Sequence, residues 1–257
     1  SFDIDMTLLN HEDYKITPSA LLAIESLREQ GHIIVLATGR NPENSDSRQF
    51  VDIVKPDAVI GLNGTLVKVG EEKIFEHFFD KDVLRGLAKY VEGKECSIGL
   101  TLEDKDYFFN PHIIDAYDFK RWGQHFRKFY PAEELFDLPI RTLTYIGPVE
   151  GAKDIEKKFP TLKLPLFAGM FGADVVEKVA SKAEGLKRLC NYFSVDLTDT
   201  VSFGDSMNDK EILEESGLGI AMGNSIEELK QYADYVTDNI AGDGVFNALV
   251  KFGFINT

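Results

Sequence analysis

Two carboxylates near the start of the chain have a spacing that could support chemistry. Asp3 and Asp5 lie two residues apart, just after an apolar start. Because side chains at positions i and i+2 of a strand project to the same face, the two carboxylates would lie side by side. Like charges at that distance repel unless a cation or a shared proton lies between them. On their own these residues are more typical of a solvated turn, and only the rest of the chain favours a reactive pair.

Three more polar segments follow apolar runs or open a helix. They are residues 38–40 (Thr-Gly-Arg), Lys182, and residues 204–209 (Gly-Asp-Ser-Met-Asn-Asp). Ligands of open α/β sheets bind beyond the carboxyl ends of the strands, so we expect these segments to meet the first pair at one edge. Together they offer carboxylates for a hard cation such as Mg²⁺ and hydroxyl, amide and ammonium groups for an anion. This combination predicts a phosphoryl-transfer site.

Strand and helix signals alternate in the elements that must position these segments. The continuous apolar run at residues 32–37 is typical of a strand buried on both faces of a parallel sheet. The alternation predicts a doubly wound (Rossmann-like) parallel sheet. The expected strands are residues 1–5, 32–37 and 58–62. One expected helix begins at Thr17-Pro18 and stops at Gly31, and a second covers residues 44–54.

The pattern changes near residue 80, which predicts an inserted domain. Residues 80–178 mix helices at 83–91, 113–128 and 149–159 with strands at 97–102, 105–109, 140–146, 164–170 and 174–178. The alternation returns with helices at 182–192, 209–216, 226–232 and 244–252 and strands at 200–203, 218–222 and 235–236. We therefore expect a discontinuous catalytic core, residues 1–79 and 179–257, around an α+β cap domain at 80–178.

Composition narrows the range of partners. The 257 residues are 44% hydrophobic, carry a net charge of −15 and show no basic stripe, so we expect no nucleic-acid partner and no membrane partner. No apolar run approaches the ~20 residues that cross a bilayer. Cys96 and Cys190 lie far apart without a CxxC pattern, which suits a reducing compartment and predicts a cytoplasmic protein. The sequence gives no indication of oligomeric state.

The four motifs, in this order, resemble those of the haloacid dehalogenase (HAD) superfamily of phosphohydrolases. The chain looks most like the Cof-type branch (subfamily IIB), which carries a large C2-type cap between the second and third motifs. The resemblance covers essentially the whole chain, and the pattern from Gly204 to Asp209 is its most specific part. It implies a Mg²⁺-dependent enzyme that acts on a small phosphorylated substrate, with a cap that selects the substrate.

The resemblance also implies roles for the carboxylates. Asp3 matches the nucleophile that forms an aspartyl-phosphate, which splits the reaction into two easier steps. Asp5 matches the general acid and base, with its backbone carbonyl on the metal and its side chain free to titrate. Asp205 matches the second carboxylate ligand, so the metal set would be Asp3, Asp5 and Asp205. Asp209 matches a supporting residue behind them.

Substrate-binding residues follow from the same resemblance. Thr38, with Gly39, matches the segment that binds the transferring phosphoryl group, and Lys182 matches the cation that offsets its charge. Asn208 matches a residue that orients the phosphate. Other readings of single residues stay open, because Thr38 could simply end a strand and Asp209 could complement a helix dipole.

Several residues near these motifs have plainer interpretations. Arg40 is more typical of a structural partner, and the five histidines, His11 among them, of surface or packing positions. Asn63-Gly64 alone is typical of a turn, although it resembles a loop that lies near the site in the Cof-type branch. The family usually has Gly where this chain has Met6. That substitution means either that the turn has ordinary helical geometry or that a strained φ is tolerated at roughly 1–2 kcal/mol.

The leading hypothesis is a phosphatase of small phosphorylated metabolites, with sugar phosphates as the first expectation. A phosphomutase of the same superfamily keeps these motifs and transfers the phosphoryl group to a second hydroxyl. A phosphate-binding or signalling protein without turnover also needs an acidic pocket with Thr and Lys, although receiver domains lack an insertion of this length. Turnover of a generic phosphate ester would separate the first hypothesis from the last.

Overall fold

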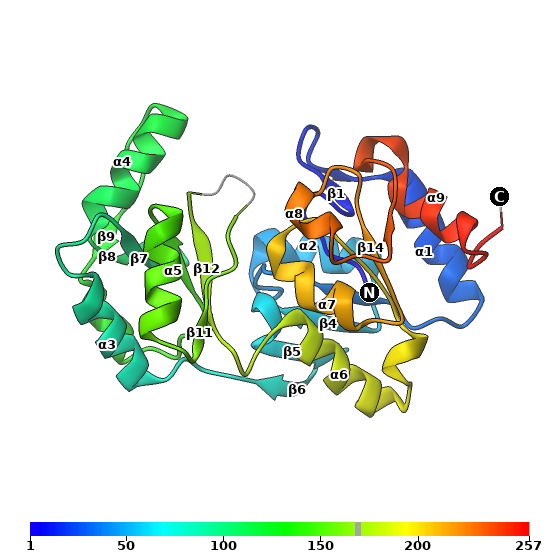
Figure 1. The fold of residues 1–257 in the computed structure, drawn as a ribbon, viewed down its shortest axis with the longest axis horizontal. Helices are drawn as coiled ribbons and strands as arrows, with labels where there is room; N and C mark the ends of the chain where they lie inside the picture. The colour runs from blue at the N-terminus through cyan, green and yellow to red at the C-terminus, as the bar shows by residue number, and fades with distance from the viewer. Residues whose placement is uncertain (168–170, 257) are drawn as a thin grey trace. The chain divides into compact units, whose positions relative to one another are not determined.

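The computed structural model describes residues 1–167 and 171–256, and the chain forms two compact units. The first unit comprises Ser1–Glu76 and Ala180–Thr257, and the second comprises His77–Val179 (Figure 1). Each unit has a hydrophobic core of its own. The first unit is therefore built from two segments far apart in the sequence.

The first unit is built on one sheet whose two halves meet at the N-terminal segment. Phe2 forms parallel bridges with both Leu36 and Phe203. One half contains β3 (Val35–Ala37), β4 (Ala58–Gly61), β5 (Leu66–Val69) and β6 (Glu72–Glu76), and the other contains β13 (Val201–Gly204), β14 (Leu218–Ala221) and β15 (Tyr235–Val236). Every pairing is parallel except those of β5 and β6, which form an antiparallel edge.

The strand expected at residues 1–5 is shorter than predicted. Phe2 bridges β3 and β13, and the chain then turns at Ile4, whose carbonyl accepts hydrogen bonds from three amides that follow it. The turn leads into a small hairpin of β1 (Leu9–Asn10) and β2 (Lys15–Ile16), which the sequence analysis missed. The β5–β6 hairpin was missed as well.

Helices cover both faces of this sheet, which confirms the doubly wound prediction. Alternate residues of β3 pack into hydrophobic cores on opposite faces of the sheet. Leu36 packs with α1 (Pro18–Glu29), α2 (Ser45–Val54) and α9 (Gly244–Lys251). Val35 and Ala37 pack with α6 (Lys182–Phe193) and α7 (Lys210–Glu215). A short helix, α8 (Glu227–Lys230), precedes β15, and α1 and α9 lie side by side (Figure 1).

The second unit is an α+β domain on a six-stranded sheet. Its strand order is β11-β12-β10-β7-β8-β9, and only the β8–β9 pair is parallel. The strands are β7 (Ser97–Leu102), β8 (Lys105–Phe109), β9 (Phe129–Tyr130), β10 (Leu143–Ile146), β11 (Leu162–Lys163) and β12 (Ala173–Glu177). Helices α3 (Lys81–Val91) and α5 (Val149–Lys158) pack in the main core, and α4 (Pro111–Trp122) packs in a second, smaller one.

Two predictions in this unit were wrong in extent. The helix expected at residues 113–128 ends at Trp122, because Gly123 takes a left-handed φ of 73° and its amide bonds the carbonyl of Phe119. The strand expected at 164–170 is replaced by the earlier β11 and a single bridge at Leu166. Its last three residues, 168–170, lie outside the described residues.

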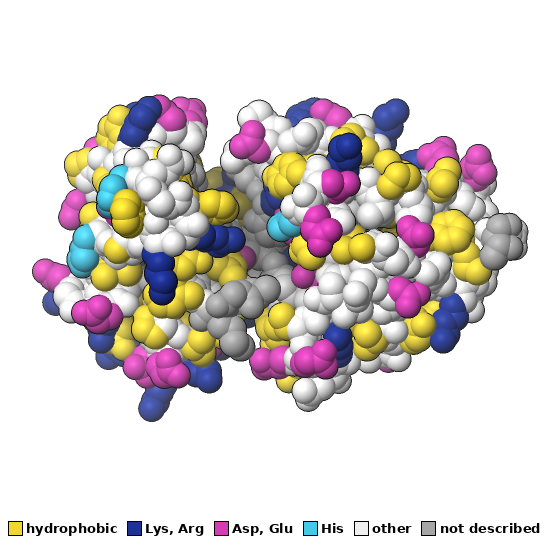
Figure 2. Space-filling view, turned by 90° about the horizontal axis from the view of Figure 1, so that it is seen from above, with side chains coloured by type: hydrophobic (Ala, Val, Ile, Leu, Met, Phe, Trp, Pro, Cys, Tyr) yellow, Lys and Arg dark blue, Asp and Glu magenta, His cyan; other side chains and the backbone are white. Residues whose placement is uncertain are grey.

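Acidic and basic side chains are mixed on the face of the molecule drawn in Figure 2. On the face drawn in Figure 2, acidic side chains lie over both units and the Lys and Arg side chains among them form no continuous stripe. Within the described ranges, no helix is both long and apolar enough to span a bilayer.

Candidate active site

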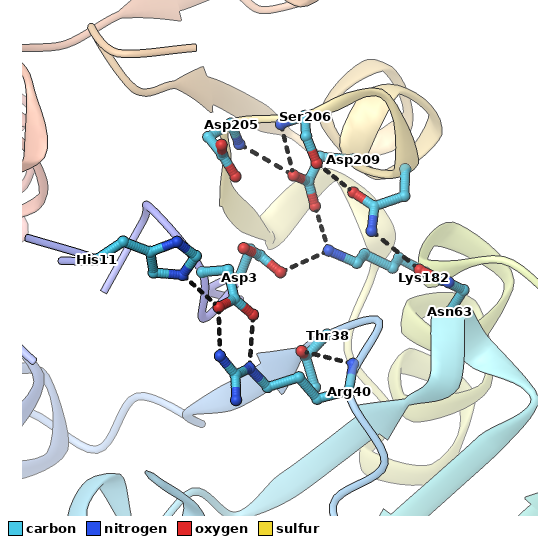
Figure 3. Close-up of polar contacts among 11 residues, drawn as sticks. Asp3, His11, Thr38, Arg40, Asn63, Lys182, Asp205, Ser206 and Asp209 are labelled. Atoms are coloured by element: carbon cyan, nitrogen blue, oxygen red, sulfur yellow. Dashed lines mark hydrogen bonds and ion pairs between the residues drawn. The ribbon is translucent and has the colours of Figure 1, made fainter. Parts of the chain in front are cut away.

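Lys182 lies at the centre of the predicted site. Ser181 caps α6, its Oγ accepting a hydrogen bond from the amide of Glu184, and this cap fixes Lys182 as the first helical residue. The lysine side chain is fully buried, and its Nζ donates to Asp3 Oδ1 and Asp209 Oδ1, both at 2.6 Å (Figure 3). Burial alone would lower the pKa of Lys182, but the charges of Asp209 and Asp3 raise it above its usual value. Lys182 is therefore held as a cation.

Three buried carboxylates surround this lysine. Oxygens of Asp3, Asp205 and Asp209 all lie within 4.8 Å of one another. Burial, with the charges of Asp209 and Asp5, raises the pKa of Asp3 to about 7 against the opposing charge of Lys182. Burial, then the charges of Asp3 and Asp209, raises the pKa of Asp205 to about 9. One lysine does not balance three carboxylates, so the cluster has the charge and oxygen donors that suit a divalent cation.

Asp209 and Asp205 differ in what their oxygens contact. Asp209 Oδ2 accepts from the amides of Asp205 (2.9 Å) and Ser206 (3.1 Å), and its Oδ1 is bound to Lys182. The Asp205 carboxylate accepts no hydrogen bond from any residue in the described ranges. A Cβ at Gly204 would lie 2.4 Å from the Asp209 side chain, so only Gly fits there. Asp209 thus orients the loop, while Asp3 and Asp205 keep oxygens available for a metal.

Thr38 and Gly39 follow β3 directly, at the same edge of the sheet. Thr38 is buried, and its Oγ1 accepts a hydrogen bond from the amide of Arg40 at 3.0 Å. A Cβ on Gly39 would lie 3.3 Å from the side chain of Asn63 and 3.5 Å from that of Asn208, so Gly keeps this approach open. Asn208 donates to Asn63 Oδ1 at 3.0 Å. The structure therefore brings Gly39, Asn63 and Asn208 together beside Thr38.

The Asn63-Gly64 turn is closer to the site than a plain turn would be. Leu62, Asn63 and Gly64 have φ values of 50°, 55° and 92°, a run in the left-handed region that stores strain. A Cβ at Gly64 would lie 2.0 Å from the carbonyl oxygen of Ser181. The turn is thus packed on the residue that caps α6, and no spacing in the sequence signals this contact.

The Asp5 side chain, which we expected to be free to titrate, has two hydrogen-bonding partners. Its oxygens accept hydrogen bonds from Arg40 Nε (2.7 Å), Arg40 Nη2 (2.6 Å) and His11 Nε2 (2.7 Å). Burial would raise the pKa of Asp5, but Arg40 and then His11 hold it below its usual value. His11, interpreted from the sequence as a surface or packing residue, reaches Asp5 from the β1–β2 hairpin. The sequence missed this contact because the hairpin was not recognised.

Met6 adopts the strained alternative. Its φ is 56°, in the left-handed region, and not the ordinary helical geometry that the sequence left open. The Met6 amide donates to the carbonyl of Leu9 at 2.9 Å, and Asn224 Nδ2 donates to the Met6 carbonyl at 2.8 Å. These bonds hold the turn that follows the two aspartates.

Asp3, Thr38 and Asp205 all come at or just after the ends of parallel strand segments, and a buried lysine joins them from α6. This fold and this charge arrangement define a phosphoryl-transfer enzyme of the doubly wound class.

Comparison with known proteins supports the assignment to phosphoryl-transfer enzymes. A family model described as haloacid dehalogenase-like hydrolase matches residues 1–249, and the chain belongs to this family. It is a HAD phosphatase of the Cof-type, subclass IIB branch.

Relatives match over nearly the full length. YkrA of Bacillus subtilis (strain 168), whose name marks it as a candidate phosphatase, is 30% identical across 99% of this chain and 97% of YkrA. A structure described as that of the HAD subclass IIB sugar phosphatase BT4131 has a TM-score of 0.83 and 29% identity, covering 99% of this chain and 98% of that one. The HMP-PP phosphatase of Yersinia enterocolitica is 26% identical over 90% of this chain and 85% of its own.

Replacing Lys182 with Met should destabilise the protein in a pH-dependent manner. Breaking a buried ion pair by removing one partner typically costs about 3–5 kcal/mol. Without Lys182 the pKa of Asp3 rises further, so Asp3 is neutral at low pH and the loss is smaller there. Asp3 of the wild type ionises near its pKa of about 7 while that of the variant stays protonated, so the loss grows as pH rises above about 7. Urea unfolding at pH 5 and pH 8 measures both values, and an equal loss at the two pH values would contradict the assigned pair.

Met6→Gly should be more stable than Met6→Ala by about 1 kcal/mol, because the left-handed backbone penalises any Cβ. The order is the reverse of that found at an ordinary helical position, where Ala is the better residue. Both variants lack the Met side chain, so their difference isolates the backbone term. Thermal or urea unfolding of the pair gives the comparison, and Ala equal to or above Gly would show that φ is not positive in solution.

Proposed function

We propose that the protein hydrolyses small phosphorylated metabolites, with sugar phosphates as the substrate class, through an aspartyl-phosphate on Asp3. The observation that carries the proposal is the buried Lys182 that contacts both Asp3 and Asp209 beside the free carboxylate of Asp205. That arrangement combines a nucleophile, a fixed cation for the phosphoryl oxygens and surplus carboxylate oxygens. Each is what phosphoryl transfer needs, because its catalysis consists mainly of positioning and charge stabilisation.

The donor set fits Mg²⁺. Asp3 and Asp205 would supply carboxylate oxygens and Asp5 its backbone carbonyl, while Asp209, whose oxygens are engaged elsewhere, would support the loop. When bound, Mg²⁺ would neutralise the cluster and the phosphoryl oxygens.

The two steps use this chain's own groups. An Asp3 oxygen attacks phosphorus, the bond to the leaving oxygen breaks, and that oxygen takes a proton from Asp5. Water then attacks the aspartyl-phosphate and gives its proton to Asp5, the bond between phosphorus and the Asp3 oxygen breaks, and phosphate leaves. Lys182 offsets charge on the phosphoryl group, and Thr38, Gly39 and Asn208 would orient it.

The names of relatives support the substrate class only in part. One neighbour is described as a sugar phosphatase, and others are named for 5-amino-6-(5-phospho-D-ribitylamino)uracil, phosphoglycolate and HMP-PP. All of these are small phosphorylated molecules. Both cysteines are buried and free, which supports a reducing compartment such as the cytoplasm.

Hydrolysis of p-nitrophenyl phosphate with Mg²⁺ tests the reaction. We expect turnover that falls to the enzyme-free rate with EDTA or with Asp3→Asn, because each removes a group that acts on the phosphorus centre. Asp52→Asn, an exposed aspartate on α2, should leave the rate unchanged. Activity that survives Asp3→Asn would refute the proposed nucleophile, and a wild type without turnover would favour a mutase or a binding protein.

Magnesium affinity should rise with pH from about 6 to 9. The pKa values of Asp3 (about 7) and Asp205 (about 9) are raised, so protons occupy these carboxylates below those values and the cation must displace them. At pH 8 binding should release about one proton, mainly from Asp205. Calorimetry in two buffers of different ionisation enthalpy measures this release, and Asp205→Asn should abolish it. Affinity independent of pH would contradict the proposed ligands.

A further inference from the structure

Arg40 forms a two-point contact with Asp5 that the proposed reaction does not by itself explain. Its Nε and Nη2 donate to the two different oxygens of Asp5, at 2.7 and 2.6 Å. Paired donation of this kind fixes the plane of a carboxylate as well as its position. His11 Nε2 adds a third donor to Oδ1 at 2.7 Å. Asp5 is therefore held from two elements, the loop after β3 and the β1–β2 hairpin.

The guanidinium is itself held in place. It lies over the ring of Phe50, 5.0 Å from the centroid, and 5.9 Å from the centroid of Tyr14. Its Nη1 and Nη2 also donate to the Tyr14 hydroxyl at 3.3 and 3.4 Å. Phe50 is a buried residue of α2, so this support is anchored in the core of the unit. Arg40 is thus a fixed part of the site, unlike a flexible surface arginine.

The contact favours one of the two proton transfers that Asp5 would perform. Arginine has five N–H donors and no acceptor, so a carboxylate in its fork is oriented as a proton acceptor with its remaining lone pairs directed elsewhere. An oriented acceptor is what the second step needs, when a water proton must pass to Asp5 as the water oxygen bonds to phosphorus. The first step instead needs a proton to leave Asp5.

We propose that Arg40, supported by Phe50 and Tyr14, is a positioning residue that aims Asp5 at the attacking water and so sets the rate of aspartyl-phosphate hydrolysis. His11, in the β1–β2 hairpin, supports the same orientation of Asp5 through its hydrogen bond to Oδ1. The inference rests on the proposed function, because it assumes the intermediate on Asp3. In the balanced step, water becomes the fourth oxygen of phosphate, its proton goes to Asp5, and the electron pair of the broken phosphorus–oxygen bond returns to Asp3.

The test is Arg40→Met with p-nitrophenyl phosphate and Mg²⁺, using a rapid acid quench to measure the fraction of enzyme carrying hydroxylamine-labile phosphate on Asp3. This leaving group needs little help from an acid, so kcat/KM reports the first step and kcat the second. We expect kcat to fall about 10²-fold or more, the scale of general acid–base catalysis. We expect kcat/KM to change by less than about threefold and the phosphorylated fraction to rise above that of the wild type.

Matched variants separate positioning from a general loss of structure. Arg48→Met removes an exposed arginine of α2 that pairs with Glu71, and it should leave both constants and the phosphorylated fraction unchanged. Arg40→Lys keeps the charge but not the fork, so we expect a smaller shift in the same direction. Tyr14→Phe should also cause a smaller shift in the same direction. If Arg40→Met does not fold, Arg40→Lys and Tyr14→Phe take its place in the test.

The proposal is overturned if kcat and kcat/KM of the Arg40 variants fall together without added phosphoenzyme, or if neither changes. The first result would assign Arg40 to the first step or to the fold, and the second would leave it without a kinetic role. A wild type that shows neither turnover nor phosphate on Asp3 would instead refute the proposed function, so the two failures are distinct.

Discussion

The structure of the site depends on one buried interaction, the pairing of Lys182 with Asp3 and Asp209. Taking three charged groups out of water is costly, and only close contacts with complementary charge offset that cost. The contacts of 2.6 Å on both sides meet this requirement. They also join three places in the chain that lie far apart in sequence. The second unit is inserted between two of them, so the core must assemble across this insertion before the lysine finds its partners.

A second cation explains why two neighbouring aspartates behave differently. Asp3 pairs with Lys182 inside a crowded acidic cluster, where burial raises its pKa to about 7. Asp5 lies two residues further along the chain, and Arg40 with His11 holds its pKa below the usual value despite burial. Adjacent carboxylates whose environments shift their pKa values in opposite directions are typical of sites that divide chemical roles. In this protein two cations from different parts of the fold, Lys182 and Arg40, contact the two aspartates.

Close backbone approach gives the site its rigidity. Gly204 leaves no room for a Cβ beside Asp209, and Gly64 leaves none beside the Ser181 carbonyl. The first contact fixes the loop after β13, and the second fixes the start of α6. The lysine and the acidic loop are therefore held at two glycines where a Cβ would not fit. At Met6 the chain instead tolerates a left-handed residue, with Asn224 and Leu9 bonding its backbone.

The sequence by itself determined the class of fold, and it predicted a division near residue 80 and a set of polar residues at the sheet edge. It could do so because strand and helix periods and the polar residues after apolar runs are local signals. Only the tertiary structure decided which cation pairs with which carboxylate, since Arg40 and His11 reach Asp5 from separate elements. The tertiary structure also decided the contact of Gly64 with Ser181. It likewise decided the short first strand, which ends where the Ile4 carbonyl accepts hydrogen bonds from three later amides. Such pairings depend on distances between segments remote in sequence, and no residue spacing encodes them.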